Sequence, residues 1–186
     1  LSAIILIPLS LYFIFHGSFM LMFFTATCFL VACYEWHMMT KKKSFKNYGF
    51  FFLVFSFYTF YELELTIVLF VILICVSTDI GGYVFGKLFK GPKLTKISPN
   101  KTYAGMIGGY FLSLICLTII SNFIDANTPI QFFLLTLIIS TVSQIGDIII
   151  SYFKRLSKIK DTGKIIPGHG GLLDRIDGMI FAFPVV

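Results

Sequence analysis

Charged side chains and glycines concentrate in residues 151–177, the polar run, which reads SYFKRLSKIKDTGKIIPGHGGLLDRID. Its cations are Lys154, Arg155, Lys158, Lys160, Lys164 and Arg175, its carboxylates are Asp161, Asp174 and Asp177, and Pro167, Gly168, Gly170 and Gly171 bracket His169. Glycines let a ligand approach backbone amides, cations neutralise phosphoryl oxygens, and carboxylates hold bridging metal ions. The polar run therefore predicts phosphate chemistry.

Two further carboxylates lie within apolar stretches. Asp79 lies in VSTDIGGYVFG, and Asp147 lies in SQIGD. A carboxylate inside a membrane span costs at least about 2.5 kcal/mol, so such a residue is functional by default. Helical spacing places Ser143 and Asp147 on one face, with Lys154 two turns further along it. The alternative for both acids is a polar contact within a helix bundle.

The segment SPNKTYAG, residues 98–105, is a third candidate for phosphate binding. Ser98 can cap a helix that begins at Pro99 and leave free amides aimed at an anion. Lys101 and Thr102 would then contact phosphate. The alternative for Lys101 is an ordinary lysine of a basic loop.

Composition excludes a soluble protein, because 57% of the residues are hydrophobic, 23 are Phe and the mean hydropathy is +0.89. A spanning helix needs roughly 20 apolar residues, and several such stretches follow one another here without barrel-like alternation. The net charge of +6 does not indicate nucleic acid, because all Lys and Arg fall in three loops, at residues 41–46, 87–101 and 154–175. The four dispersed cysteines match neither a zinc site nor a disulfide framework.

The apolar runs predict an all-α, polytopic transmembrane bundle of about six spans plus a C-terminal partial span. The runs are residues 1–15, 18–36, 48–60, 63–84, 103–124 and 130–153, with the partial span at 179–186. This order places the basic loops on one face, cytoplasmic by the positive-inside rule, and the acidic turns at Glu62, Glu64 and Asp125 on the other. Glu35, Trp36 and His37 are interpreted as interfacial residues. We divide the chain into N-terminal helices, 1–84, and a catalytic region, 85–186.

The polar run resembles the C-terminal signature of the CDP-diacylglycerol synthases, also called phosphatidate cytidylyltransferases. The residues that carry this resemblance are Ser151, Phe153, Lys154, Arg155, Lys160, Asp161, Gly163, Ile166, Pro167, His169, Gly170, Gly171, Asp174, Arg175 and Asp177. The segments around Asp79 and Lys101 also resemble the family, with Gly82 where Ala is usual and Ala104 where Glu is usual.

The resemblance implies a metal-dependent nucleotidyltransferase that makes CDP-diacylglycerol and pyrophosphate from CTP and phosphatidate. It implies Mg²⁺ on Asp147 and Asp174, with room for a second cation. The implied catalytic residues are Lys154, Arg155, His169, Asp174, Arg175 and Asp177. The implied substrate-binding residues are Asp79, Ser98, Lys101, Thr102, Gly170 and Gly171.

The family also implies a homodimer in a bacterial inner membrane, in contact with membrane lipid, with further spans before Leu1. For His169 the alternative is a turn residue, and for Asp177 a helix cap. Three other functions stay open: an inactive or truncated family member, a small cation-coupled transporter, and a phospholipid headgroup transferase of the CDP-alcohol type. The transporter is disfavoured because Asp79 and Asp147 lie toward the same face as the polar run. The transferase is disfavoured because its spaced aspartates are missing.

Overall fold

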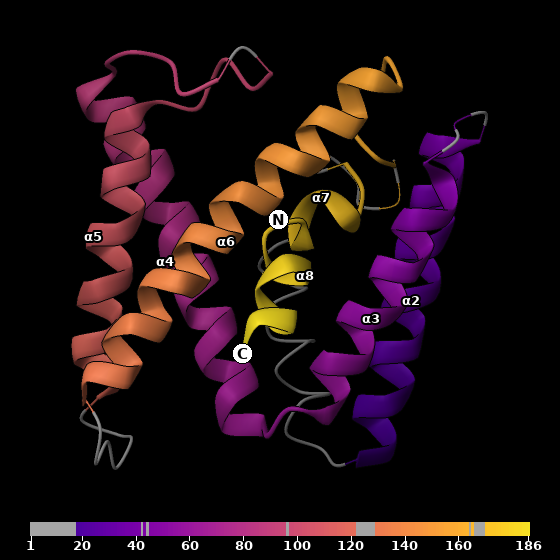
Figure 1. Cartoon of the computed structure of the whole chain (residues 1–186), viewed down its shortest axis with the longest axis horizontal. Coiled ribbons are helices and arrows are strands. Elements are labelled where there is room, and N and C mark those ends of the chain that lie inside the picture. The colour runs from indigo at the N-terminus through magenta and orange to yellow at the C-terminus, as the bar shows by residue number, and fades with distance from the viewer. Residues whose placement is uncertain are drawn as a thin grey trace. The chain divides into compact units, whose positions relative to one another are not determined.

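A computed structural model describes residues 18–41, 43, 45–95, 97–121, 129–163, 165 and 170–186. The elements are α2 (Ser18–Thr40), α3 (Lys46–Glu62), α4 (Leu65–Phe89), α5 (Tyr103–Ile120), α6 (Pro129–Leu156), α7 (Leu173–Ile176), α8 (Met179–Ala182) and the 3₁₀ helix η1 (Phe183–Val185) (Figure 1). One isolated bridge pairs Lys93 with Thr102. The described part of the chain is thus all-α, as predicted.

Four of the described helices are long and apolar enough to cross a membrane, in place of the six that were predicted. They cover residues Phe19–Thr40, Leu65–Phe89, Tyr103–Ile120 and Ile130–Leu156. The run at 48–60 forms α3, whose 17 residues extend about 25 Å against a hydrocarbon core of about 30 Å. The predicted span at 1–15 lies outside the described residues.

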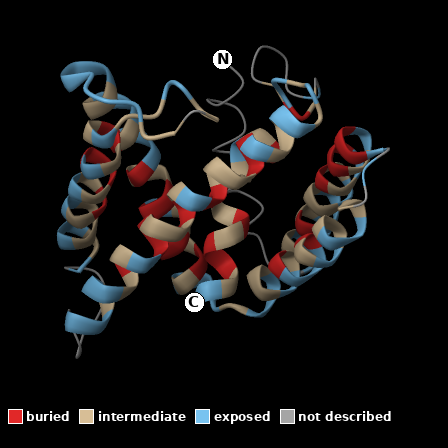
Figure 2. Cartoon of the chain, turned by 45° about the horizontal axis from the view of Figure 1, so that its top comes forward, coloured by how far each residue is buried: buried red, intermediate tan, exposed pale blue. Residues whose placement is uncertain are grey.

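Large apolar side chains on these helices are exposed. On α2, Phe19, Phe23, Leu30 and Tyr34 are all more than half exposed, and Figure 2 shows exposed and intermediate surface along the outer sides of the long helices. Such surface suits contact with lipid tails. The protein is therefore a membrane protein with four candidate spans.

The chain forms two compact units. Unit 1 contains residues 1–65 and 153–176, and unit 2 contains residues 66–152 and 177–186. Helix α6 runs from unit 2 into unit 1. The division of the chain after residue 84 assigns the catalytic residues to the C-terminal part. These units are defined by contacts and do not test that assignment.

In unit 1, Trp36 joins α2 to its neighbours. Its indole Nε1 donates to the Lys46 carbonyl (2.9 Å), and its ring packs against Phe45 and Phe153. Gly49 gives the ring room, because a Cβ there would overlap it. Trp36 is only 3% exposed, so its interpretation as an interfacial residue is wrong.

In unit 2, glycines bring α4 and α5 into close contact. A Cβ on Gly105 would lie 2.6 Å from the Gly82 carbonyl oxygen, and one on Gly86 would lie 3.5 Å from Gly105 Cα. Small residues four apart permit such close approach of spanning helices. Hydroxyls attach α6 to this pair: Thr78 to Ser140 (3.0 Å) and Tyr110 to Thr141 (2.8 Å).

The predicted helix start at Ser98 is wrong. Residues 99–100 form a turn, closed by Lys101 N–H donating to the Ser98 carbonyl (3.1 Å), and α5 begins only at Tyr103. Thr102 is the N-cap, because its hydroxyl accepts from Gly105 N–H (3.1 Å). The bridge at Lys93 holds this loop beside Thr102. An acceptor at the cap and an extended backbone outweigh the preference of Pro99 for a first turn.

Candidate functional site

A cavity of about 310 Å³ in unit 2 collects five of the residues chosen from the sequence. Asp79 contributes from α4, Ser98, Lys101 and Thr102 from the loop and cap before α5, and Asp147 from α6. The close crossing of α4 and α5 and the Thr102 cap explain why these distant segments share one cavity. The cavity therefore combines two carboxylates, a cation and neutral hydroxyls.

Two charged groups of this cavity, Lys101 and Asp147, are paired with each other. Lys101 Nζ forms an ion pair with Asp147 Oδ2 and lies 3.4 Å from the Gln144 carbonyl oxygen, to which it donates. Both partners are partly exposed, at 23% and 32% of their side chains. Both groups are therefore accessible to a ligand. The Lys101 ammonium can neutralise a phosphate, and the Asp147 carboxylate can donate an oxygen ligand to a metal ion.

The donor set of the cavity fits Mg²⁺. This ion is usually held by one or two carboxylates and by substrate phosphates, with several waters retained. Asp79 and Asp147 supply two carboxylates on the cavity wall. Among the described residues, no group of three or more His, Cys, Asp or Glu side chains could hold a metal ion. Asp174 belongs to unit 1 and Asp147 to unit 2, and their pairing as ligands stays a prediction.

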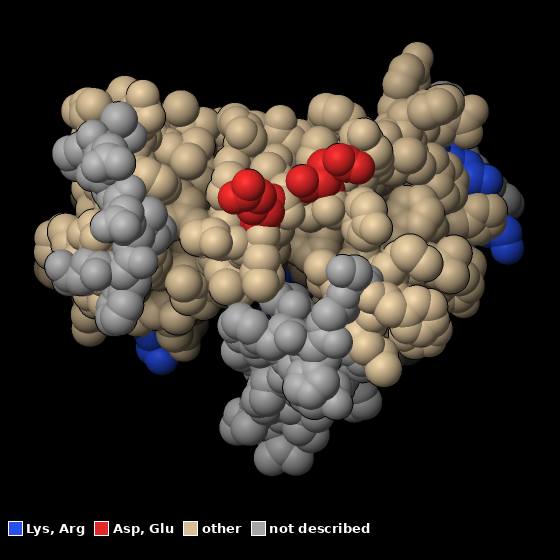
Figure 3. All heavy atoms as spheres, turned by 90° about the horizontal axis from the view of Figure 1, so that it is seen from below, with Lys and Arg blue, Asp and Glu red and all other residues tan. Residues whose placement is uncertain are grey.

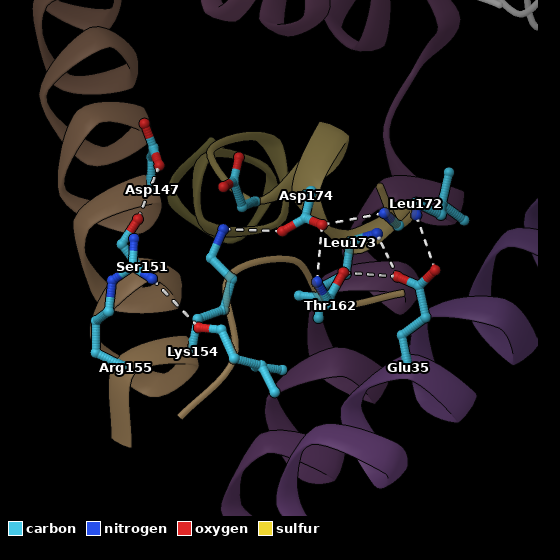
Figure 4. A network of polar contacts seen from close by, with 12 residues as sticks. Glu35, Asp147, Ser151, Lys154, Arg155, Thr162, Leu172, Leu173 and Asp174 are labelled. Atoms are coloured by element: carbon cyan, nitrogen blue, oxygen red, sulfur yellow. Dashed lines mark hydrogen bonds and ion pairs between the residues drawn. The ribbon is translucent and has the colours of Figure 1, made fainter. Parts of the chain in front are cut away.

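In unit 1, the carboxylate of Asp174 is the centre of a second polar cluster (Figure 4). Its Oδ1 accepts from Lys154 Nζ (2.8 Å), and its Oδ2 accepts from the backbone N–H groups of Thr162 (2.8 Å) and Gly171 (3.0 Å). Lys154 and Asp174 are 12% and 8% exposed in their side chains. Burial alone would raise the pKa of Asp174, but these hydrogen bonds and the Lys154 charge hold it below its usual value.

A second buried carboxylate, Glu35 of α2, accepts three hydrogen bonds from the polar run. Thr162 Oγ1 donates to Oε2 (3.0 Å), Leu172 N–H donates to Oε1 (2.9 Å), and Leu173 N–H donates to Oε2 (2.8 Å). Glu35 is 1% exposed, so its interpretation as an interfacial residue is wrong. The sequence signal that could have found it is the one used for Asp79, a carboxylate inside an apolar helix.

Glycines surround these two carboxylates. A Cβ on Gly163 would lie 2.5 Å from Glu35 Oε1, and one on Gly171 would overlap Glu35 Oε2 and the Thr162 hydroxyl. Gly170 has a positive φ of 85°, and a Cβ there would lie 2.9 Å from Asp174 Oδ2. In the described residues, the glycines of the polar run thus make room for the protein's own carboxylates. Their predicted contact with a phosphate stays a prediction.

Of the remaining predicted residues, Arg155 and Arg175 belong to unit 1 and Asp177 belongs to unit 2. Arg155, near the end of α6, is exposed and donates to the Ile159 carbonyl (3.3 Å). Arg175 is exposed on α7. Asp177, between α7 and α8, accepts from Gly178 N–H (3.0 Å). His169 lies outside the described residues.

Ser151 contacts Asp147 within α6. Its hydroxyl lies 3.5 Å from Asp147 Oδ1, to which it donates, at the four-residue spacing of one helical turn. Lys154 follows three residues later in the same helix. The helix that this spacing assumed is present from Ser143 to Lys154, and the shared role of these residues stays a prediction.

Comparison with known proteins agrees with this chemistry. A model of the Cytidylyltransferase family matches residues 45–186. A phosphatidate cytidylyltransferase of Staphylococcus aureus (strain COL) is 45% identical over 136 residues, which are 70% of this chain and 52% of the relative.

Proteins of the same name are similar in two further species. That of Staphylococcus haemolyticus is 46% identical over 121 residues, 64% of this chain and 46% of the relative. That of Staphylococcus epidermidis is 42% identical over 136 residues, which are 70% of this chain and 52% of the relative. The chain spans about half the length of the curated relatives it matches. Since the family model covers well over half of the chain, including the whole polar run, this protein belongs to the cytidylyltransferase family.

Proposed function

We propose that this protein is a phosphatidate cytidylyltransferase, which converts CTP and phosphatidate to CDP-diacylglycerol and pyrophosphate. The observation that carries the proposal is the cavity shared by Asp79, Lys101, Thr102 and Asp147 in a chain of this family. The relatives that bear this name support the choice of substrates. The long apolar helices support a substrate with acyl chains.

The proposed reaction is a direct displacement. A phosphate oxygen of phosphatidate attacks the α-phosphorus of CTP, the bond from that phosphorus to the oxygen bridging to the β-phosphorus breaks, and pyrophosphate leaves. A phosphomonoester has a second pKa near 6, so the attacking oxygen is largely ionised at neutral pH without a general base. The main barrier is repulsion between two polyanions, which positioned cations lower.

The chain's own residues supply positive charge and orientation. Lys101, held by Asp147, neutralises a CTP phosphate, and the Thr102 hydroxyl, whose oxygen accepts the cap bond, donates its hydrogen to another. Lys154, held by Asp174, neutralises the headgroup phosphate, with Arg155, Arg175 and His169 as further contacts. Mg²⁺, on Asp147 with Asp79 or Asp174, would supply Lewis-acid neutralisation of the phosphates and of the leaving pyrophosphate.

The expected setting is a bacterial cytoplasmic membrane, with the basic loops and the active site on the cytoplasmic side, where CTP is available. Glu62, the last residue of α3, and Glu64, which directly precedes α4, are both exposed. On the face turned toward the viewer in Figure 3, acidic side chains lie near the centre, while described Lys and Arg appear at the rim. The positive-inside rule is the reason for placing the basic loops in the cytoplasm. A homodimer is part of the proposal through family resemblance alone.

The test is formation of CDP-diacylglycerol and pyrophosphate by purified protein in detergent micelles with CTP, phosphatidate and MgCl₂. We expect product that disappears on removal of Mg²⁺ and in Asp147→Asn and Asp174→Asn, while the matched exposed variant Glu62→Gln keeps wild-type turnover. Thermal unfolding of each variant shows whether it folds.

Two outcomes would contradict the proposal. Wild-type protein that is folded and binds CTP but forms no product would identify an inactive member of the family. Turnover that persists in both folded Asp variants would end their assignment to the reaction.

A further inference from the structure

Glu35 is a carboxylate in α2 that lies outside the motifs chosen from the sequence and outside the residues matched by the family model. We propose that Glu35 is a positioning residue for the transfer reaction: it holds Thr162, Leu172 and Leu173 and thereby sets the position of Asp174 and Lys154. The expected effect of Glu35 on the reaction rests on the proposed function. The anchor itself can be measured without any reaction.

The three hydrogen bonds to Glu35 come from two places in the polar run. Thr162 precedes the glycine-rich segment, and Leu172 and Leu173 follow it. One side chain from a residue more than 120 positions earlier therefore bonds to Thr162, Leu172 and Leu173 together (Figure 4). A buried acceptor with matching donors on both sides fixes geometry far more tightly than a solvated one, because losing it leaves buried donors unpaired.

The donors explain why the position carries a carboxylate. Three donors point at two oxygens, and an ionised carboxylate is an acceptor with no competing donor of its own. A glutamine at this position would keep one oxygen and turn an N–H₂ group toward at least one of the same donors. Gly163 and Gly171 lie directly against the two carboxylate oxygens, because a Cβ on Gly163 would lie 2.5 Å from Oε1 and one on Gly171 would overlap Oε2.

Thr162 connects the anchor to the functional carboxylate. Its hydroxyl donates to Glu35 while its backbone N–H donates to Asp174 Oδ2 (2.8 Å). Asp174 follows directly after the two anchored amides of Leu172 and Leu173, and its other oxygen accepts from Lys154 (2.8 Å). Glu35 thus fixes the backbone on both sides of Asp174, and Asp174 fixes the Lys154 ammonium.

Helix α2 is a suitable support for such an anchor. The next residue, Trp36, is buried, bonds to the Lys46 carbonyl and packs against Phe153, one residue before Lys154. Glu35 and Trp36 therefore tie the two parts of the cluster, the end of α6 and the start of α7, to one helix. Preorganisation of this kind lowers the cost of ordering charged groups when substrate arrives.

The test compares Glu35→Gln with the matched exposed variant Glu62→Gln and the pair Thr162→Val and Thr162→Ser. We expect Glu35→Gln to lower kcat about 10- to 100-fold, as displacement by about 1 Å does, with KM for CTP within about twofold of wild type. Thr162→Val should lower kcat in the same sense, Thr162→Ser should restore it, and Glu62→Gln should match wild type. The kcat effect without a KM effect distinguishes positioning from general loss of folded enzyme.

The second measurement is hydrogen exchange at the amides of Leu172 and Leu173, which needs no substrate. Glu35→Gln should raise their exchange rates while amides of the α4–α5 crossing keep the wild-type rates. Unchanged exchange at both amides would overturn the anchor. Unchanged kcat in Glu35→Gln, with an active wild type, would overturn its catalytic consequence.

The two proposals fail in different ways. If the wild type makes no product, the proposed function fails, and the exchange data alone decide whether Glu35 is the anchor. If Glu35→Gln unfolds, the test uses Thr162→Val in its place. A lowered kcat of Thr162→Val supports the inference, and a kcat equal to that of the wild type overturns it.

Discussion

Three carboxylates of this protein have different partners and hence different chemistry. Asp147 has an accessible lysine as its ion partner, so it can exchange that partner for a ligand. Asp174 is enclosed by one lysine and two backbone amides. Glu35 is enclosed by a hydroxyl and two amides. The hydrogen bonds to Asp174 and Glu35 fix the backbone around these carboxylates. The ion pair of Lys101 and Asp147 is accessible in the cavity and is available for binding a ligand.

The lowered pKa of Asp174 predicts a pH dependence of stability. Its hydrogen bonds favour the charged form in the folded state, so their contribution is complete above the usual aspartate pKa of about 4 and is lost as the pH falls through the lowered value. We expect Asp174→Asn to unfold at a lower temperature than wild type at pH 7. The difference should shrink steadily as the pH falls below about 4. Thermal unfolding in detergent from pH 7 to pH 2 measures this.

The matched control for that titration is Asp161→Asn, an exposed aspartate of the same run. Its unfolding temperature should follow the wild type at every pH. A Tm difference for Asp174→Asn that stays constant down to pH 2 would contradict the assigned hydrogen bonds.

Removing the Glu35 side chain should destabilise unit 1 strongly. Glu35→Ala leaves two buried donors and one part-buried donor without their acceptor, at about 1–3 kcal/mol for each unpaired group. We therefore expect a fall of about 3 kcal/mol or more in the free energy of unfolding. Chemical denaturation of the micellar protein measures it, and a loss below about 1 kcal/mol would mean that water replaces the missing oxygens.

At the residue scale, the sequence predicted the acids within the polar run and within α4 and α6, because their chemistry contrasts with their apolar surroundings. It did not predict the partner of Glu35. Hydrophobic periodicity describes a residue's neighbours along one helix, whereas the donors to Glu35 come from more than 120 positions away. Two of those donors are backbone amides, which carry no side-chain signal at all.

At the scale of elements, the contact of α4 with α5 depends on individual glycines. We expect Gly105→Ala to destabilise unit 2 by about 1–3 kcal/mol, because its Cβ would lie 2.6 Å from the Gly82 carbonyl oxygen and force the helices apart. Gly82→Ala is the matched variant, since its Cβ would lie 3.7 Å from the Gly105 carbonyl oxygen, an ordinary contact. Thermal unfolding compares the two, and equal losses would contradict the described crossing.

The same scale shows where local rules misplaced an element. Ser98-Pro99 is a favourable start for a helix, yet Thr102 caps α5 because the extended loop pairs with Lys93 and brings the Thr102 hydroxyl to Gly105. Likewise, the apolar run at 48–60 was interpreted as a span, but α3 ends at Glu62 after 17 residues. The start of α5 is decided by the contacts of the loop with Lys93 and Gly105. The number of candidate spans is decided by the length of α3.

At the scale of the whole molecule, α4 predicts the orientation in the membrane. Glu64 directly precedes it and Lys93 follows it, and its 25 residues extend about 37 Å, enough to cross the hydrocarbon core. In a variant with all four cysteines replaced by serine, Glu64→Cys should react with an impermeant maleimide added outside intact cells. Lys93→Cys should react only after permeabilisation.

The control for this experiment is the serine variant without an added cysteine, which should stay unlabelled. Labelling of both added cysteines from the same side would show that α4 does not cross the membrane. Labelling in the reverse order would place the basic loops outside the cell.

The anchor at Glu35 also bears on where a folding unit of this protein starts. The family match begins at residue 45 and contains the entire polar run, yet the acceptor for three donors of that run lies upstream, in α2. A fragment cut at residue 45 would retain the shared signature and lose the cooperative contact that stabilises it. The segment matched by the family model and the compact unit that contains the polar run therefore have different boundaries, and the second includes Glu35 of α2.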